Sequence, residues 1–168
     1  MAIELYDLSV PAFRRGFAAL SAILEKARAH ADERGIRHET LLTARLYEDM
    51  HPLTSQVQRA SDAAKFALAR LSGIDAPAMP DSEASFADLQ DRITRTVAFL
   101  DTVPADAVNG KEAIDVEVKT PSRSFHFKGQ DYLLGFALPN FYFHLTTAYA
   151  ILRNQGLPLG KMDYLGSR

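Results

Sequence analysis

One segment of the chain has almost no polar face: Phe141-Tyr142-Phe143-His144-Leu145-Thr146-Thr147-Ala148-Tyr149-Ala150-Ile151-Leu152. A helix that is apolar nearly all round is buried on several sides. We therefore expect this segment to be the central helix of the fold, with one flank covered by a β-hairpin that precedes it in the chain or by a second subunit. The helical region extends over residues 131–154, and Pro139 either kinks it or restarts it at a first-turn position.

The N-terminal part of the chain has the alternating three- and four-residue spacing of a long amphipathic helix. Its apolar seam consists of Ile3, Tyr6, Val10, Phe13, Phe17, Leu20, Leu24, Ala27 and Ala31. Gly35 follows at the place of a left-handed C-terminal cap. A second seam, from Leu42 to Leu71, predicts another long helix, which Pro52 should kink because proline removes a hydrogen bond.

The remaining segments complete the predicted architecture. Residues 73–84 contain two prolines and little periodicity, so they predict a linker. Ser85-x-x-Asp88 is typical of a helix start and opens a third, shorter helix over residues 86–100. The period then changes to two over residues 114–127, which indicates a β-hairpin, and the tail after Pro158 is expected to be irregular. The sequence thus predicts an all-α fold, a four-helix bundle of one domain (residues 1–168) with a small β-hairpin between helices three and four.

The composition narrows the function classes. The 168 residues include no cysteine, which excludes a thiol nucleophile, a cysteine-ligated metal and a disulfide framework. A formal net charge of -2 provides no basic field for nucleic acid. The N-terminus is acidic where a signal peptide is basic, and no apolar run has the length of a membrane span. We expect a cytoplasmic protein that contacts neither nucleic acid nor membrane.

Metal or acid-base chemistry must therefore come from the five histidines, the carboxylates and the hydroxyls. The sequence contains neither H-E-x-x-H nor H-x-x-x-H, the strong zinc patterns. Glu48-x-x-His51 matches half of a di-iron code, but a continuous helix places His51 about 140° from the apolar seam, toward solvent or a partner.

Asp49 and Gln56 lie on the inner flank of that same predicted helix, with Asp49 about 60° from the seam. One interpretation makes Asp49 a boundary carboxylate that is half solvated or paired with Arg45. The other makes it an inward-facing ligand or base. Both residues are candidates for a pocket.

His144 stands alone among aromatic residues on the most apolar helix, where a polar group needs a partner. It is either a core residue bonded to a carbonyl or hydroxyl, or a ligand or acid-base group, for which a neutral imidazole is suited. Asn140 shares its helix face and is within reach of the ring. The pocket candidates are therefore Asp49, Gln56, Asn140 and His144.

Three blocks of the chain resemble a known family: residues 47–57, YEDMHPLTSQV; residues 138–153, LPNFYFHLTTAYAILR; and residues 160–166, GKMDYLG. The family is a bacterial and fungal one of unknown function (domain of unknown function nineteen ninety-three) in the DinB/YfiT-like superfamily of metalloenzyme-like proteins. The resemblance covers nearly the whole chain. It implies a helical bundle, commonly dimeric, in which better-studied members hold a divalent metal with three histidines, two of them from an H-x-x-x-H of the last helix, and some act as thiol-dependent transferases or isomerases.

The chain departs from that pattern at the metal site, since the residues four positions from His144 are Asn140 and Ala148. Three hypotheses follow. The first is a DinB-like homodimer of unknown biochemical role without a firmly bound metal or cofactor. The second is a hydrolase or transferase that binds nickel or zinc through His144 with Asp49 or His51. The third is a non-catalytic binder of a small molecule that uses the aromatic residues of the last helix: Phe141, Tyr142, Phe143 and Tyr149.

Overall fold

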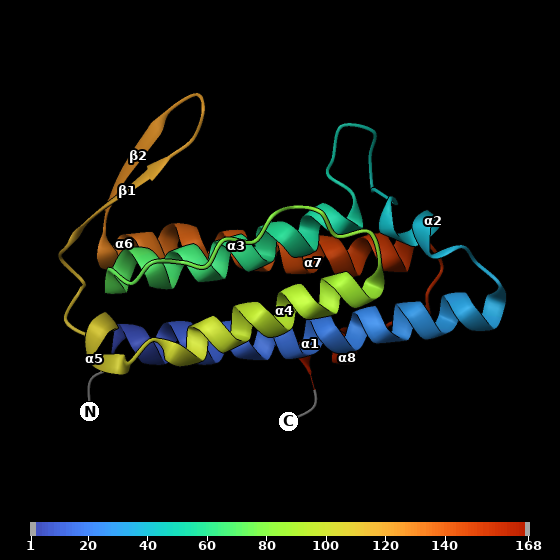
Figure 1. Ribbon diagram of the computed structural model, residues 1–168, viewed down its shortest axis with the longest axis horizontal. Coiled ribbons are helices and arrows are strands. Elements are labelled where there is room, and N and C mark those ends of the chain that lie inside the picture. Colours follow the sequence, from blue (N-terminus) through green and yellow to red (C-terminus); the bar gives the residue numbers. More distant parts are fainter. Residues whose placement is uncertain (1–2, 167–168) are drawn as a thin grey trace.

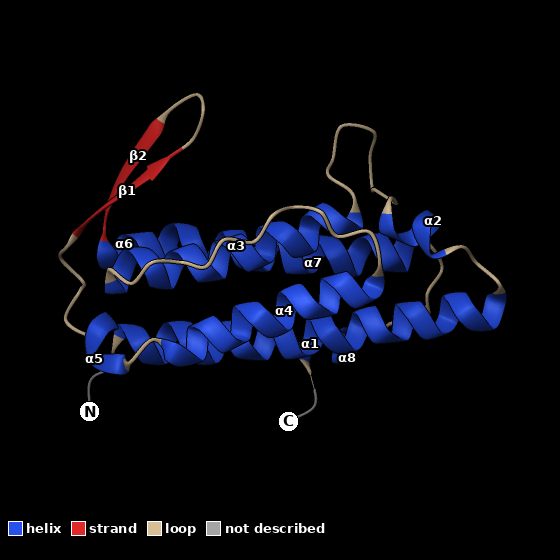
Figure 2. Cartoon of the chain, in the orientation of Figure 1, coloured by secondary structure: helices blue, strands red, loops and turns tan. Residues whose placement is uncertain are grey.

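The computed structural model describes residues 3–166 and is mostly helical, with one small antiparallel sheet (Figure 2), as the sequence predicts. The elements in chain order are α1 (Leu5–Arg34), α2 (His38–Leu42), α3 (Leu53–Ser72), α4 (Phe86–Thr102), α5 (Ala105–Val108), β1 (Asp115–Lys119), β2 (Ser124–Lys128), α6 (Gly129–Tyr132), the π-helix η1 (Leu133–Ala137), α7 (Leu138–Asn154) and α8 (Lys161–Leu165).

The long helices α1, α3, α4 and α7 lie side by side along the long axis of the molecule (Figure 1). Helix α3 packs against α4 and α7, and α1 packs against the same two helices, so each long helix has two long neighbours. Their inner faces share one cluster of buried apolar side chains. None of the helices between residues 3 and 166 has the length and apolar character needed to cross a membrane.

Helix α1 buries its predicted seam from Val10 to Ala31, and Gly35 ends the helix in the left-handed conformation at φ 64°. Ile3, the first residue of the predicted seam, lies before the helix and is 73% exposed. Gly16 allows α1 to approach α7 closely, because a Cβ there would lie only 2.5 Å from Cε1 of Phe141. The Phe141 ring packs edge-on against Phe13 and Phe17, each at a centroid distance of 5.0 Å. The central segment of the sequence is therefore buried against α1 on this flank.

The predicted second helix is wrong over its first half. Residues 43–52 are irregular, and α3 begins at Leu53, immediately after Pro52, whose backbone is extended at ψ 171°. Proline disfavours a helical conformation in the residue before it, so the helix starts after Pro52 instead of bending there. The amide of Leu53 donates to the carbonyl oxygen of Ala44 at 3.0 Å, which closes the irregular segment into a compact loop.

The predicted hairpin is present, with Val116 opposite Phe127 and Val118 opposite Phe125. Both valines are buried, and Phe127 packs on Phe136 of η1 at a centroid distance of 5.4 Å. The hairpin therefore covers the start of the C-terminal helical region, at one end of the molecule (Figure 1).

Pro139 lies in the first turn of α7, as one of the two expected arrangements has it, but the backbone stays helical through Ala137 and Leu138. Residues 129–154 are therefore one continuous helical run, with the π-helix η1 just before the proline. The tail is not wholly irregular as expected, because Asp163 accepts a hydrogen bond from the Gly160 amide at 2.8 Å and caps the short helix α8.

Candidate functional site

A groove of about 210 Å³ lies between α3 and the segment that runs from α6 to α7, and we call it the α3–α7 groove. One wall is a single face of α3. The opposite wall comes from α6, η1 and α7, and β1 of the hairpin contributes one side chain. The lining residues are Arg59, Asp62, Ala63, Phe66 and Arg70 on α3, Tyr132, Phe136, Ala137, Asn140 and His144 opposite them, and Val118.

His144 lies in the wall formed by α6, η1 and α7, and only 8% of its surface is exposed. Among the titratable side chains of this wall, only Tyr132 is more buried. Its Nδ1 lies 2.8 Å from Oε1 of Gln56, a side chain that is 2% exposed. The Gln56 amide nitrogen donates in turn to the carbonyl oxygen of His51 at 2.9 Å. A carbonyl oxygen only accepts, so this second bond fixes the orientation of the Gln56 amide. Oε1 of Gln56 must then accept a hydrogen bond from Nδ1–H, so Nδ1 carries the proton of the neutral ring and Nε2 has the lone pair.

The His144 imidazole is neutral near pH 7. Burial is the main cause that lowers its pKa to about 4, and the positive charges of Arg59 and His51 add to the effect. Among residues 3–166, Nδ1 is the only ring nitrogen of His144 with a hydrogen-bond partner. The site therefore presents one unused acceptor, Nε2, on a residue that lines a groove.

Two arginines of α3 make the groove electropositive. Neither Arg59 nor Arg70 forms an ion pair within the described part of the chain. Arg70 donates to the hydroxyl of Tyr132 at 2.8 Å and lies over the ring of Phe66, 5.2 Å from its centroid. Asp62 is the one carboxylate of the lining, and its Oδ1 already pairs with Lys65 and Arg92, each at 2.9 Å.

The structure brings together only part of the candidate set. Gln56 and His144 are in contact and Asn140 lines the same groove, but Gln56 occupies the position next to the ring that we expected for Asn140. Asp49 and His51 are exposed on the 43–52 loop. Their predicted orientations assumed a helix that does not exist there, so the inward-facing Asp49 is a wrong prediction.

The pair of Asp49 with Arg45 does not form either, since Arg45 donates to the backbone carbonyl of Glu48 at 3.2 Å. Sequence analysis also missed Arg59 and Arg70. Their shared face of α3 with Ala63 and Phe66 was the available signal, because residues three, four and seven apart line one helix face.

A divalent metal does not fit these residues. A catalytic zinc takes three protein ligands and an open position. Within residues 3–166 no group of three or more histidine, aspartate or glutamate side chains is arranged to share one ion. The groove instead sets one imidazole beside a guanidinium, whose charge opposes a cation.

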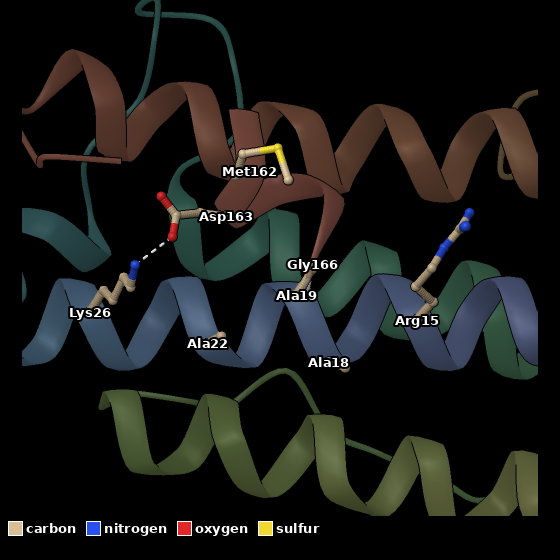
Figure 3. A pocket seen from close by; sticks show the side chains of 8 residues that line it. All are labelled: Arg15, Ala18, Ala19, Ala22, Lys26, Met162, Asp163 and Gly166. Atoms are coloured by element: carbon tan, nitrogen blue, oxygen red, sulfur yellow. Dashed lines mark hydrogen bonds and ion pairs between the residues drawn. The ribbon is translucent and has the colours of Figure 1, made fainter. Parts of the chain in front are cut away.

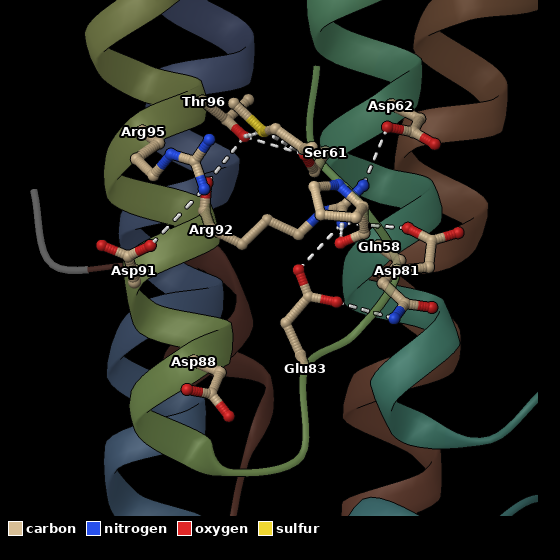
Figure 4. Close-up of polar contacts among 12 residues, drawn as sticks. Gln58, Ser61, Asp62, Asp81, Glu83, Asp88, Asp91, Arg92, Arg95 and Thr96 are labelled. Carbon is tan, nitrogen blue, oxygen red and sulfur yellow. Dashed lines mark hydrogen bonds and ion pairs between the residues drawn. The ribbon is translucent and has the colours of Figure 1, made fainter. Parts of the chain in front are cut away.

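A second buried polar centre lies on the other side of α3, around Arg92 of α4 (Figure 4). The guanidinium is 1% exposed and pairs with Asp62 at 2.9 Å, Asp81 at 2.9 Å and Glu83 at 2.8 Å. Burial alone would raise the pKa of Glu83, but hydrogen bonds from Arg92 and Gln58 outweigh it and lower the pKa. This centre fastens the irregular segment 73–85 onto α3 and α4.

A larger cleft, of about 510 Å³, lies between α1 and α8 (Figure 3). Its lining includes Ala18, Ala19 and Ala22. Two of its three charged residues, Lys26 and Asp163, form an ion pair, and the third is Arg15. It contains no buried titratable group, so the smaller α3–α7 groove is the candidate functional site.

Residues 5–165 match the family model described as "Domain of unknown function (DUF1993)". A solved structure described as a DinB family member protein from Shewanella denitrificans is similar to the chain, with 38% sequence identity and a TM-score of 0.90, over 98% of this chain and 93% of that one. No curated protein matches the chain. The chain belongs to the DUF1993 family, and its fold is the DinB-like helical fold.

Proposed function

We propose that this member of the DUF1993 family binds a small molecule in the α3–α7 groove, without a resident metal, and that the ligand donates a hydrogen bond to Nε2 of His144. The main support for this proposal is the hydrogen bond of 2.8 Å between Nδ1 of His144 and Oε1 of Gln56, because it fixes the tautomer of the ring and leaves Nε2 as an acceptor. We also propose that α1, α3, α4 and α7 form a four-helix bundle of a single domain, in which this groove is a seam.

The pKa of His144 favours binding over catalysis. A general base is most effective when its pKa lies near the working pH. A pKa of about 4 makes His144 a weak base at pH 7, since only roughly one ring in a thousand carries a proton there. Neutral Nε2 is nevertheless a good hydrogen-bond acceptor.

The donor set supports a site without metal rather than the nickel- or zinc-dependent alternative. Asp49 and His51 lie exposed on the 43–52 loop, whereas His144 is buried against Gln56. Elemental analysis of protein purified without a histidine tag tests this point. We expect nickel and zinc well below one equivalent and an unchanged melting temperature on chelation.

Filling the groove tests the ligand-binding proposal itself. Ala63 lines the groove, so Ala63→Leu should occupy ligand space, and Ala87→Leu on the exposed side of α4 is the matched control. In a thermal-shift screen against a metabolite panel, a ligand at 100 times its Kd adds about 2.7 kcal/mol to the stability of the protein. We expect stabilisation of the wild type and of Ala87→Leu that Ala63→Leu abolishes. Absence of stabilisation by any compound, or stabilisation that survives Ala63→Leu, contradicts the proposal.

We further propose that the protein is a homodimer in the cytoplasm. Several large apolar side chains of α7 and the 43–52 loop remain exposed: Phe143 at 57%, Leu46 at 37% and Tyr47 at 65%. Leu46 and Phe143 line one shallow cleft. A stable dimer buries more than about 1,000 Å². Sedimentation at micromolar concentration should show a dimer that Phe143→Glu dissociates, and a wild-type monomer refutes the proposal.

A further inference from the structure

We infer that the ligand of the α3–α7 groove is an anion with three parts: a carboxylate or phosphate head group held by Arg59, a separate hydroxyl or N–H group that donates to Nε2 of His144, and an apolar body that lies along Phe66 and Phe136. This inference rests on the proposed function, because it names the class of ligand for the same site.

The first support is the charge of the groove. Arg59 and Arg70 are positive, and Asp62 is the only carboxylate among the lining residues. Asp62 is shared by two buried cations, Lys65 at 3% exposure and Arg92 at 1% exposure. The groove is therefore locally positive in a chain whose formal net charge is -2. An uncompensated positive cleft attracts and retains anions.

The second support is that the two arginine side chains differ in their contacts. Arg70 is held by the Tyr132 hydroxyl at 2.8 Å and by the rings of Phe66 and Tyr132. Arg59 is exposed and, within residues 3–166, has no hydrogen-bond or ion-pair partner, although its charge lowers the pKa of His144. A planar guanidinium that is free to move binds carboxylate or phosphate through two parallel hydrogen bonds. Arg59 is thus the head-group residue, and Arg70 is part of the far wall.

The third support is the surface between the two arginines. Arg59 and Arg70 are eleven positions apart on α3, which corresponds to about 16 Å along the helix axis. Ala63, Phe66 and Phe136 line this interval and offer apolar contact area. A head group at Arg59 therefore leaves room for an extended apolar body, and a compact inorganic ion would leave that area unused.

Matched probes test the charge requirement directly. Phenylbutyrate and phenylbutyramide have nearly the same shape, but only the first is an anion, and phenyl phosphate tests the phosphate alternative. The amide can donate to Nε2 of His144 and the carboxylate cannot, so a preference for the acid arises in spite of that bond and comes from the guanidinium. Binding to the full chain is followed by amide and side-chain chemical shifts in NMR titrations at millimolar concentration.

We expect phenylbutyrate or phenyl phosphate to bind at least about tenfold more tightly than phenylbutyramide, since a hydrogen bond to a charged group is worth about 1.4 kcal/mol or more. Arg59→Gln should remove most of this preference. Arg34→Gln, an exposed arginine on α1 with the same loss of charge, should leave it intact.

The outcomes separate the two proposals. If phenylbutyrate and phenylbutyramide bind equally tightly and both shift the NMR signals of His144 and Asn140, the anion inference is overturned while the groove remains a ligand site. If the preference for the acid survives Arg59→Gln, or if no probe binds, the inference also falls. Failure of Ala63→Leu to abolish stabilisation by panel compounds is the separate result that removes the proposed function.

Discussion

The two buried polar centres on either side of α3 differ in how completely they are satisfied. Each uses a buried glutamine of α3: Gln58 donates to Glu83 at 2.8 Å in the Arg92 centre, and Gln56 accepts from His144 at 2.8 Å in the groove. The Arg92 centre is charged and closed, with three carboxylates around one guanidinium. The His144 centre is neutral and open, with one ring nitrogen bonded and the other without a partner in the described chain.

This difference separates a structural role from a binding role. Buried polar groups are normally hydrogen-bonded, so a network that satisfies itself stabilises the fold and has little left for a ligand. Among the described side chains, Nε of Arg92 is the one buried polar atom without a partner. Arg92 itself does not line the groove, and its two terminal nitrogens already pair with carboxylates. Nε2 of His144 lies on a residue that lines the groove, so its missing partner can come from outside.

The largest expected effect is a loss of stability when the Arg92 centre is disrupted. Arg92→Met leaves Glu83 without its buried counter-charge and leaves Asp62 with Lys65 alone. Breaking a buried ion pair in this way costs about 3–5 kcal/mol of stability. Denaturant unfolding of Arg92→Met against Arg95→Met measures it. Arg95 is exposed and makes only two long contacts, with Asp91 at 3.8 Å and with the carbonyl oxygen of Ala78 at 3.4 Å, so its loss should change stability by less than about 0.5 kcal/mol. Equal stabilities of the two variants would contradict a structural role for the Arg92 centre.

The second effect is a dependence of stability on pH in the open centre. The pKa of His144 is lowered in the folded protein, from 6.5 to about 4, so below pH 6.5 the unfolded chain binds a proton that the folded chain does not. The His144 contribution is therefore complete above pH 6.5 and falls by up to about 3 kcal/mol as the pH drops to 4. His144→Asn should remove this slope between pH 4 and 6.5.

The Arg92 centre responds in a different window. The pKa of Glu83 is lowered below its ordinary value of 4.5, so its contribution is present above pH 4.5 and is lost as the pH falls through the folded-state pKa. The two centres are thus separable by pH. A wild-type stability that stays constant from pH 7 to pH 4.5 would contradict a buried neutral His144.

A smaller effect distinguishes the two glutamines. Gln56→Leu leaves Nδ1 of His144 and the carbonyl oxygen of His51 without a partner, which costs about 1–3 kcal/mol. Gln56→Glu places a carboxylate beside the ring and should raise the pKa of His144 above about 4, toward 6.5. Gln58→Glu is the control, since it lies beside Glu83 and should leave the His144 titration in place. NMR titration of His144 measures its pKa in both glutamate variants. An unchanged pKa of His144 in Gln56→Glu would refute the contact between residues 56 and 144.

The smallest effect is expected at the loop residues. Asp49→Asn and His51→Asn alter exposed side chains, so each should change stability by less than about 0.5 kcal/mol. Ligand stabilisation in the groove should also persist in both. Loss of ligand binding in either variant would return these residues to the site.

The helix seams and the hairpin were predictable because burial imposes a period on the sequence, as in α1 and in the alternation around Val116. The loop before α3 was not, because the apolar spacing continues through Leu46 and Met50 although Pro52 starts the helix anew. His144 was predictable as a buried histidine. Its partner was not, since Gln56 and Asn140 both lie within plausible reach and only the packing of α3 on α7 decides between them.

The tautomer of His144 is the most direct test of the central claim, and long-range proton–nitrogen NMR of the imidazole rings measures it. We predict that at pH 7, with and without a chelator, Nδ1 of His144 carries the proton and Nε2 is bare, and that both signals shift when a groove ligand binds. A protonated Nε2, a charged ring at pH 7, or a signal that changes on chelation would contradict the account.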